Sequence, residues 1–132
     1  MRVPGVTRRQ VVCDEIVELV DVLPTACELL MVPTPDCLEG KSLVPLLRDP
    51  LQPWKRGAFT IRATEDRVGR SVRTKRWRYT DWQMIGSVHR HFELYDLDTD
   101  PLERTNLATD PGHRNERTIL ANLLQRGWRA AQ

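Results

Sequence analysis

Apolar residues change their spacing along the chain, and the first spacing is that of a helix. Five apolar side chains form one stripe at helical spacing after Asp21: Val22, Leu23, Ala26, Leu29 and Leu30. Pro24 is compatible with a helix only in its first turn, where a backbone N–H lacks an intrahelical partner in any case. We therefore expect a helix near 21–31, with the Asp21 carboxylate capping amides at its start. A second, shorter helix is expected near 42–47.

The middle of the chain changes to the two-residue period of β-strands. Aromatic and β-branched residues are frequent there, and four short segments alternate well enough to be strands with one buried face: 57–64, 70–74, 77–82 and 92–97. Only Lys75 and Arg76 separate the second segment from the third, so these two are expected to form a hairpin, although the pair lacks the Asn-Gly preference of two-residue turns. The pattern predicts a four-stranded antiparallel sheet.

Helical spacing returns at the end of the chain. Asp110 and Pro111 are typical of an N-cap followed by the first helical residue, and the expected helix lies near 111–130. Its apolar stripe is expected to pack against the sheet and comprises Ile119, Leu120, Leu123, Leu124 and Trp128. Short helices, then strands, then a helix indicate an α+β fold. We divide the chain into residues 1–53 and 54–132.

Composition excludes some classes of protein. Of the 132 residues, 40% are hydrophobic and 29% are charged, a globular rather than a disordered balance. The net charge of +2 is too small to favour a nucleic-acid or membrane partner, and no apolar run approaches the roughly 18 residues of a membrane span. No signal peptide is expected within this chain, because the first residues lack an apolar segment.

Cysteines and histidines give little support to a metal site. Cys13, Cys27 and Cys37 are an odd number without C-x-x-C spacing, so we expect free thiols, while a disulfide between Cys13 and Cys37 stays open. His89 and His91 are expected in an exposed hairpin loop without carboxylate or thiol neighbours, a poor arrangement for holding a metal.

One acidic run resembles the start of a calcium-binding loop. Asp96, Asp98 and Asp100 alternate as the first ligands of an EF-hand do. Pro101 follows at once, however, and the glycine and closing glutamate that such a loop requires are absent from their positions. A strand that ends in a turn explains these residues better than calcium binding does.

The most distinctive local feature is a basic stretch mixed with aromatic residues: Arg67, Arg70, Arg73, Lys75, Arg76 and Arg78, with Trp77, Tyr79 and Trp82. Strand alternation would place Trp77 and Tyr79 on one face and the arginines at 76 and 78 on the other, which favours an ordinary half-buried hairpin. A stand-alone module that bound anionic glycan or nucleic acid would expose aromatic and basic side chains together. That module remains the alternative function.

Four segments in order resemble the C-terminal region of sulfatases, most closely the iduronate-2-sulfatase group. They are VELVDVLPT at 17–25, LEGKSLVPLL at 38–47, GRSVRTKRWRYT at 69–80 and ELYDLDTDPLERTNL at 93–107. The positions that carry the motif structurally are Asp21, Pro24, Tyr95, Asp96, Asp100, Pro101 and Asn106. The resemblance implies a fragment of an alkaline-phosphatase-like α/β enzyme, with 1–53 as a remnant of the catalytic domain and 54–132 as the C-terminal subdomain.

The same resemblance implies a sulfuric ester hydrolase whose chemistry lies elsewhere. Sulfatases use calcium and a formylglycine made from the cysteine of a C-x-P-S-R or C-x-A-S-R motif. None of the three cysteines stands in such a motif, and no catalytic or metal-binding residue can be carried over to this chain. We therefore expect a C-terminal portion that is inactive alone and that lacks its catalytic domain, which would be its partner.

The family also suggests a substrate and one residue that faces it. The substrate class implied is a sulfated glycan or another sulfate ester. Arg73 is the residue that we expect to face the substrate cleft of an intact enzyme, because a guanidinium suits sulfate and carboxylate groups. Members of the family are often periplasmic, secreted or lysosomal, which leaves the compartment of this chain open.

Overall fold

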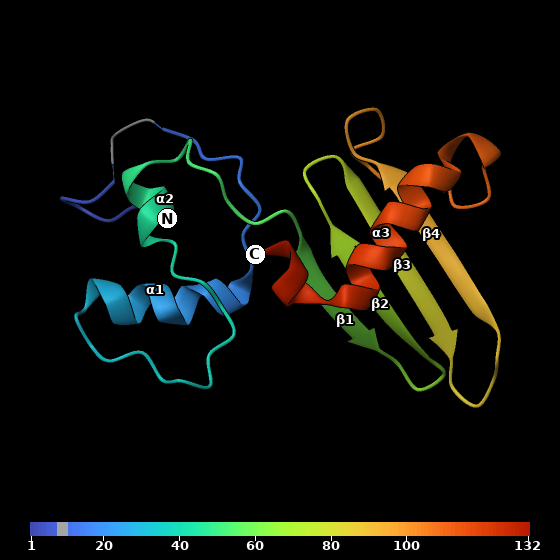
Figure 1. Cartoon of the computed structure of the whole chain (residues 1–132), viewed down its shortest axis with the longest axis horizontal. Helices are drawn as coiled ribbons and strands as arrows, with labels where there is room; N and C mark the ends of the chain where they lie inside the picture. The colour runs from blue at the N-terminus through green and yellow to red at the C-terminus, as the bar shows by residue number, and fades with distance from the viewer. Residues whose placement is uncertain (8–10) are drawn as a thin grey trace. The chain divides into compact units, whose positions relative to one another are not determined.

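The computed structural model describes residues 1–7 and 11–132, which form two compact units, Met1–Lys55 and Arg56–Gln132 (Figure 1). Residues 8–10, which belong to the segment expected over 1–53, lie outside the described residues. Within the described ranges, no helix has the length and apolar character needed to cross a membrane.

The first unit contains two short α-helices. A 3-10 turn, η1 (Leu19–Asp21), runs directly into α1 (Val22–Leu29), and α2 (Val44–Arg48) follows after a long loop. The first helix ends before the expected residue 31 because the backbone of Met31 is left-handed, with φ 55°. The second begins two residues later than expected and buries two apolar side chains, Val44 and Leu46.

Asp21 does not cap α1, so that expectation was wrong. Its backbone is already helical, with φ −77° and ψ −17°, because η1 precedes it, whereas a capping residue has extended backbone angles. The carboxylate instead accepts hydrogen bonds from the backbone N–H of Glu18 at 2.9 Å and of Lys41 at 2.8 Å. Asp21 therefore joins the start of α1 to the loop that leads to α2.

The apolar stripe expected on α1 is largely exposed. The helix buries Pro24, Thr25 and Cys27, and the Thr25 hydroxyl accepts a hydrogen bond from the Leu43 backbone N–H at 2.8 Å. This contact turns the Thr25 side of α1 toward α2. The stripe residues Val22, Leu23 and Leu30 are left at the surface, where the Leu30 side chain is 70% exposed.

The second unit contains the expected four-stranded antiparallel sheet, in the order β1-β2-β3-β4. Its strands are β1 (Ala58–Ala63), β2 (Arg67–Arg73), β3 (Trp77–Met84) and β4 (Arg90–Asp96). Residues 74–76 connect β2 and β3, with Lys75 and Arg76 at the tip of the turn, which is closed by a hydrogen bond from Thr74 N to Trp77 O at 2.8 Å. The sheet and the hairpin confirm the prediction from alternation.

Two strands begin earlier than expected. β2 starts at Arg67 rather than near residue 70, because Gly69 continues the strand beneath the ring of Trp82. A Cβ atom at position 69 would lie 2.5 Å from that ring, so the glycine serves close packing instead of breaking the strand. β4 starts at Arg90, which places His91 within the strand and corrects its assignment to the hairpin loop.

The C-terminal segment is helical in three pieces. The 3-10 turn η2 (Pro111–His113) precedes α3 (Arg114–Arg126), and η3 (Trp128–Ala131) follows it. Asp110 caps the start as predicted, since its Oδ1 accepts a hydrogen bond from Gly112 N at 2.8 Å. Gly127, with φ 77°, ends α3. Trp128 therefore lies beyond the helix, and the expected stripe is shorter than predicted.

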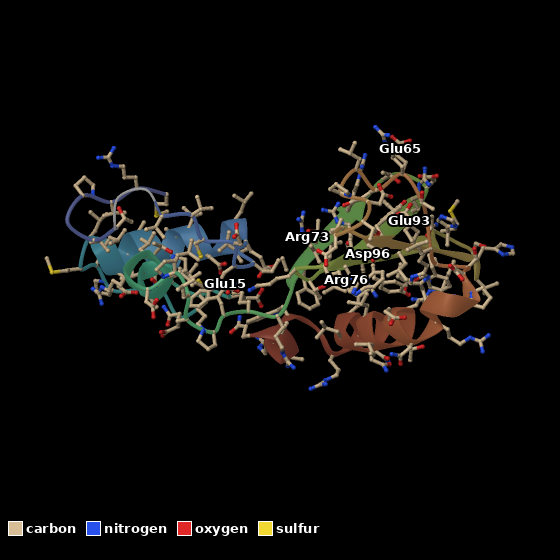
Figure 2. The ribbon with its side chains drawn as sticks, turned by 90° about the horizontal axis from the view of Figure 1, so that it is seen from above. Glu15, Glu65, Arg73, Arg76, Glu93 and Asp96 are labelled. Atoms are coloured by element: carbon tan, nitrogen blue, oxygen red, sulfur yellow. The ribbon has the colours of Figure 1, made fainter. Side chains whose placement is uncertain are left out.

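One face of the sheet packs against α3 and forms the core. The buried residues of this core are Val72, Tyr79, Leu94, Ala108 and Leu120, with Leu123 and Leu124 packed against them. Ile119 belonged to the predicted stripe, but its side chain is 57% exposed. We call this side of the sheet the helix face and the other side the open face. Figure 2 shows Arg73 and Glu93 on the open face, away from α3.

Candidate functional site

Arg73 lies in a row of side chains across the open face of the sheet. The register aligns Arg73 with Arg78 on β3 and with Tyr95 on β4. Two like charges directly opposite each other destabilise a sheet unless one is neutralised. Arg78 is neutralised, because its Nη1 lies 3.2 Å from Oε2 of Glu103. Arg73 is exposed and makes no side-chain ion pair or hydrogen bond with the described residues. Its guanidinium is therefore available to an anion.

Tyr95 closes the β4 end of this row as a neutral hydrogen-bonding group. Burial raises the pKa of Tyr95, and the nearby carboxylates of Glu93 and Glu103 raise it further, while Arg78 lowers it. A pKa above the ordinary value of about 10 keeps the phenol protonated at neutral pH. The row thus combines one available guanidinium, one guanidinium paired with a carboxylate, and one neutral hydroxyl.

Short polar side chains form the next row of the open face. The Thr80 hydroxyl donates to the Ser71 hydroxyl at 3.1 Å, and the Ser71 hydroxyl donates to the Tyr79 carbonyl at 3.2 Å. Glu93 is aligned with Thr80 in the register. The two hydroxyls serve hydrogen bonds within the sheet, so the groups left for a ligand are those of Arg73 and the residues around it.

Trp82 completes the open face at the other end of the sheet. Its ring lies on Gly69, and the guanidinium carbon of Arg67 lies 5.5 Å from the ring centroid. Arg67 is also close to a carboxylate, with its Nε 3.6 Å from Oδ1 of Asp66. The arrangement keeps the Trp82 ring flat against the sheet.

The basic hairpin follows strand alternation except in its turn. Trp77 and Tyr79 lie on the helix face and Arg78 on the open face, as predicted. The prediction for Arg76 was wrong. Its Nε and Nη2 donate to the two oxygens of Asp96 at 3.0 and 2.7 Å, and its guanidinium carbon lies 4.8 Å from the Trp77 ring centroid. Arg76 is a turn residue, so strand alternation does not fix its direction.

The acidic run after β4 is engaged in local contacts. Arg76 lowers the pKa of Asp96 through its hydrogen bonds to that carboxylate. Asp100 Oδ2 accepts from the backbone N–H of Arg104 at 2.7 Å and of Thr105 at 2.8 Å, and Pro101 lies at the surface of the same turn. These carboxylates shape the loop that begins after β4.

Asn106 covers the outer edge of β4. Its Oδ1 accepts from the backbone N–H of Leu94 at 3.0 Å and of Ala108 at 2.9 Å, and its Nδ2 donates to the Phe92 carbonyl at 3.0 Å. The Leu107 N–H adds a backbone hydrogen bond to the Leu94 carbonyl at 2.8 Å. The loop is thereby held against β4 and brings Glu103 to Arg78.

The side chains of the described residues do not fit the calcium and formylglycine of a sulfatase. No group of three or more His, Cys, Asp or Glu residues in the described part of the chain could hold a metal ion. Cys13, Cys27 and Cys37 are free thiols, and none has the sequence context from which formylglycine is made. No step of sulfate ester hydrolysis is therefore assigned to residues of this chain.

Several of these contacts were not predicted from the sequence. Glu103 and Glu93 were not selected as site residues, because their partners lie on other strands or loops. Lys55 was also missed. Its Nζ lies 2.6 Å from Oδ1 of Asp21 and 2.9 Å from Oε2 of Glu18. The one available signal was a lone lysine beside Trp54, in the loop before the first strand.

Comparisons with known proteins agree with the sulfatase resemblance. Residues 1–129 match the family model described as N-sulphoglucosamine sulphohydrolase, C-terminal. The Delta 4,5-hexuronate-2-O-sulfatase of Bacteroides thetaiotaomicron is 34% identical over 116 residues, 82% of this chain and 23% of that protein. Arylsulfatase K of Gallus gallus is 33% identical over 118 residues, 80% of this chain and 21% of that protein.

A solved structure shares the fold. A protein solved in complex with its substrate D-glucosamine-2-N,6-O-disulfate superposes with a TM-score of 0.70 and 21% identity, over 80% of this chain and 22% of that one. The chain thus spans between a fifth and a quarter of the length of these relatives. It belongs to the family defined by the C-terminal region of N-sulphoglucosamine sulphohydrolase, among the sulfatases.

Proposed function

We propose that this chain is the substrate-facing C-terminal portion of a sulfatase and that it works together with a sulfatase catalytic domain. The observation that carries this proposal is the family match over residues 1–129. In such an enzyme the catalytic domain supplies formylglycine and calcium for the attack on sulfur. This chain supplies binding and shape, so that it has no hydrolytic activity by itself.

The surface of α1 supports a catalytic domain as the partner. Large exposed apolar side chains cluster in and around this helix: Leu19, Val20, Val22, Leu23, Leu30, Met31 and Val32. Exposed apolar side chains concentrated in one segment are typical of an interaction site. We assign it to the contact with the catalytic domain. In this proposal residues 1–53 belong to that domain and residues 54–132 form the C-terminal subdomain.

Arg73 is the residue to which we assign contact with substrate. It is exposed on the open face, and Arg78 beside it is already neutralised by Glu103. A planar guanidinium binds sulfate or carboxylate oxygens through two parallel hydrogen bonds. The relatives' names point to sulfated acidic or amino sugars, so the substrate class that we propose is a sulfate ester on such a sugar.

A grafted enzyme tests the role of Arg73. The C-terminal region of the Bacteroides hexuronate-2-O-sulfatase would be replaced with this chain, and kcat and KM would be measured on a sulfated unsaturated disaccharide. Arg73→Ala is expected to raise KM about tenfold, because a hydrogen bond to a charged group contributes about 1.5–3 kcal/mol. Arg62→Ala, at an exposed arginine of the edge strand β1, is the matched control and should leave KM within about twofold.

The purified chain alone tests the division of labour. With calcium present, its hydrolysis of an aryl sulfate should equal that of buffer. Turnover by the chain alone would contradict the proposal. An active graft in which Arg73→Ala and Arg62→Ala behave alike would remove Arg73 from the substrate site and leave the family assignment intact.

A further inference from the structure

The helix face of the sheet is covered by α3 over only part of its length. Leu120 packs with Val72 and Tyr79, but the next row along the strands contains Arg70 and Asp81. Figure 1 shows the strands continuing past α3 toward the β3–β4 hairpin. A hollow of about 180 Å³ lies over this uncovered part of the sheet, next to the hairpin turn.

An ion pair forms one side of the hollow. Arg90 Nε donates to Asp81 Oδ1 at 3.0 Å, and Arg90 Nη2 donates to Asp81 Oδ2. The Asp81 side chain is only 13% exposed, whereas that of Arg90 is half exposed. This two-point contact engages both carboxylate oxygens and holds the Arg90 guanidinium in a fixed orientation at the rim.

A second guanidinium, that of Arg70, lines the hollow without an ion-pair partner among the described residues. Arg70 is directly opposite Asp81 in the β2–β3 register, yet the described residues offer it no ion pair or side-chain hydrogen bond. The neighbouring β1–β2 turn does not neutralise it either, because the Asp66 carboxylate accepts from Thr64 at 2.6 Å and pairs with Arg67. The lining groups of the hollow therefore carry two positive charges and one negative charge.

The remaining walls of the hollow are mostly apolar. Val68, Met84 and Ile85 lie beside the two arginines, and the Gln83 amide adds one uncharged hydrogen-bonding group. Sites that bind sugars and other small molecules combine an apolar surface with a few placed polar groups. This hollow has an apolar wall for the face of a sugar ring and a guanidinium for an anionic substituent.

We propose that this hollow binds the sulfate group of a sulfated sugar, with Arg70 as the main contact and with Arg90, fixed by Asp81, as the second. The choice of a sugar sulfate rests on the proposed function, whereas binding of an oxyanion rests on the hollow alone. The site lies on the helix face, so it is separate from Arg73 on the open face. A long sulfated glycan would thus have a second attachment point on this chain.

Calorimetric titration of the full-length chain tests this inference without any measurement of activity. The probes are a sulfated disaccharide, the same disaccharide without sulfate, and sodium sulfate. The sulfated disaccharide is expected to bind, and Arg70→Gln is expected to weaken binding about tenfold, the loss of one charge-assisted hydrogen-bonding group. Arg62→Gln, an exposed arginine on the open face of the neighbouring strand, is the matched control and should bind within about twofold of the unmodified chain.

Each outcome bears on the proposal. Selective loss in Arg70→Gln, with unchanged circular dichroism, supports it. Equal loss of affinity in Arg70→Gln and Arg62→Gln would show that the ligand is attracted by overall surface charge rather than by the hollow, which would overturn the proposal. Absence of binding to the unmodified chain would also overturn it. If sodium sulfate binds as tightly as the sulfated disaccharide, the hollow is a site for a free anion, and the proposal of a sugar ligand is overturned. Because the assay needs no catalytic domain, its failure is distinct from failure of the graft.

Discussion

Lys55 Nζ lies 2.6 Å from Oδ1 of Asp21, and both side chains are almost completely buried, with exposed fractions of 1% and 0%. The two residues are 34 positions apart in sequence. The contact joins the start of α1 to the last residue of the first unit. Removing one partner of a buried ion pair leaves the other charge buried without compensation, which strongly destabilises the fold.

Removal of the Asp21 carboxylate should therefore destabilise the first unit strongly. We expect Asp21→Ala to lower the free energy of unfolding by about 3–5 kcal/mol, because Lys55 is left buried with only Glu18 as a counter-charge. The backbone N–H groups of Glu18 and Lys41 would also lose their acceptor. Urea unfolding followed by circular dichroism measures the change. Asp36→Asn, at an exposed carboxylate of the same unit, should stay within about 0.5 kcal/mol. Similar effects of the two variants would show that the buried pair adds no stability.

A second prediction concerns the dependence of stability on pH. The Arg76 hydrogen bonds hold the pKa of Asp96 below its ordinary value. A carboxylate whose pKa is lower in the folded state stabilises the fold above its unfolded pKa of about 4, and this stabilisation is lost as pH falls through the folded pKa. Arg76→Gln should therefore destabilise the chain most near pH 6 and progressively less in acid. Urea midpoints measured from pH 2.5 to 6 test this (about the range in which an aspartate titrates). A difference that stayed constant with pH would exclude the ion pair as its cause.

Local signals made much of the second unit predictable. Strand alternation predicted the four-stranded sheet, and the Asp110-Pro111 pair predicted the start of the last helix, because each signal depends on neighbours in sequence. The same reasoning failed at Arg76. This residue lies in a turn, and the direction of its side chain is set by the hydrogen bond to Asp96 of β4 rather than by strand alternation. It also failed at Asp21, whose carboxylate binds the Glu18 amide at the start of η1 and pairs with Lys55, but does not cap α1.

The candidate sites were less predictable than the fold. Arg73 was selected through a family resemblance, whereas its surroundings depend on the pairing of Arg78 with Glu103, 25 residues away. The hollow around Arg70 depends on how far α3 extends over the sheet, and no pattern within β2 encodes that distance. Contacts between elements, rather than the elements themselves, are what the sequence pattern leaves undetermined.

A third prediction concerns Gly69. A Cβ atom at this position would lie 2.5 Å from the Trp82 ring, so Gly69→Ala should force the ring off the sheet and cost about 1–3 kcal/mol through overpacking. A double-mutant cycle with Trp82→Ala provides the control, because the effects of substitutions on stability are not additive for residues in contact. In the Trp82→Ala background, Gly69→Ala should cost little. An equal cost in both backgrounds would show that the glycine is required for a reason other than the ring.

A fourth prediction concerns the covered edge of β4. Asn106 makes three hydrogen bonds to this region, two of them to the backbone of Phe92 and Leu94. Asn106→Ala would leave the buried Leu94 N–H without its acceptor and should cost about 2–4 kcal/mol. Asn106→Asp keeps the acceptor but loses the donor to Phe92, so its cost should be intermediate. Hydrogen exchange of the Leu94 amide reports the edge directly, and an unchanged exchange rate in Asn106→Ala would contradict the assigned role.

The exposed apolar side chains of α1 lead to the last prediction. Leu23 and Leu30 lie on the surface that we assign to a catalytic domain, and apolar surface without its partner favours self-association. Sedimentation velocity of the chain alone should show association that increases with concentration. The double variant Leu23→Lys and Leu30→Lys should reduce it while changing stability by no more than about 0.5 kcal/mol, since both side chains are exposed.

The control for this experiment is an exposed apolar side chain of the second unit. Val88, in the β3–β4 hairpin, is 92% exposed, so Val88→Lys removes exposed apolar surface from the second unit and leaves α1 unchanged. If self-association depends on the α1 surface, Val88→Lys should leave it unchanged while the double variant reduces it. Equal effects of the two changes would mean that general surface hydrophobicity drives association, and the α1 surface would then lose its support as the place where a catalytic domain binds.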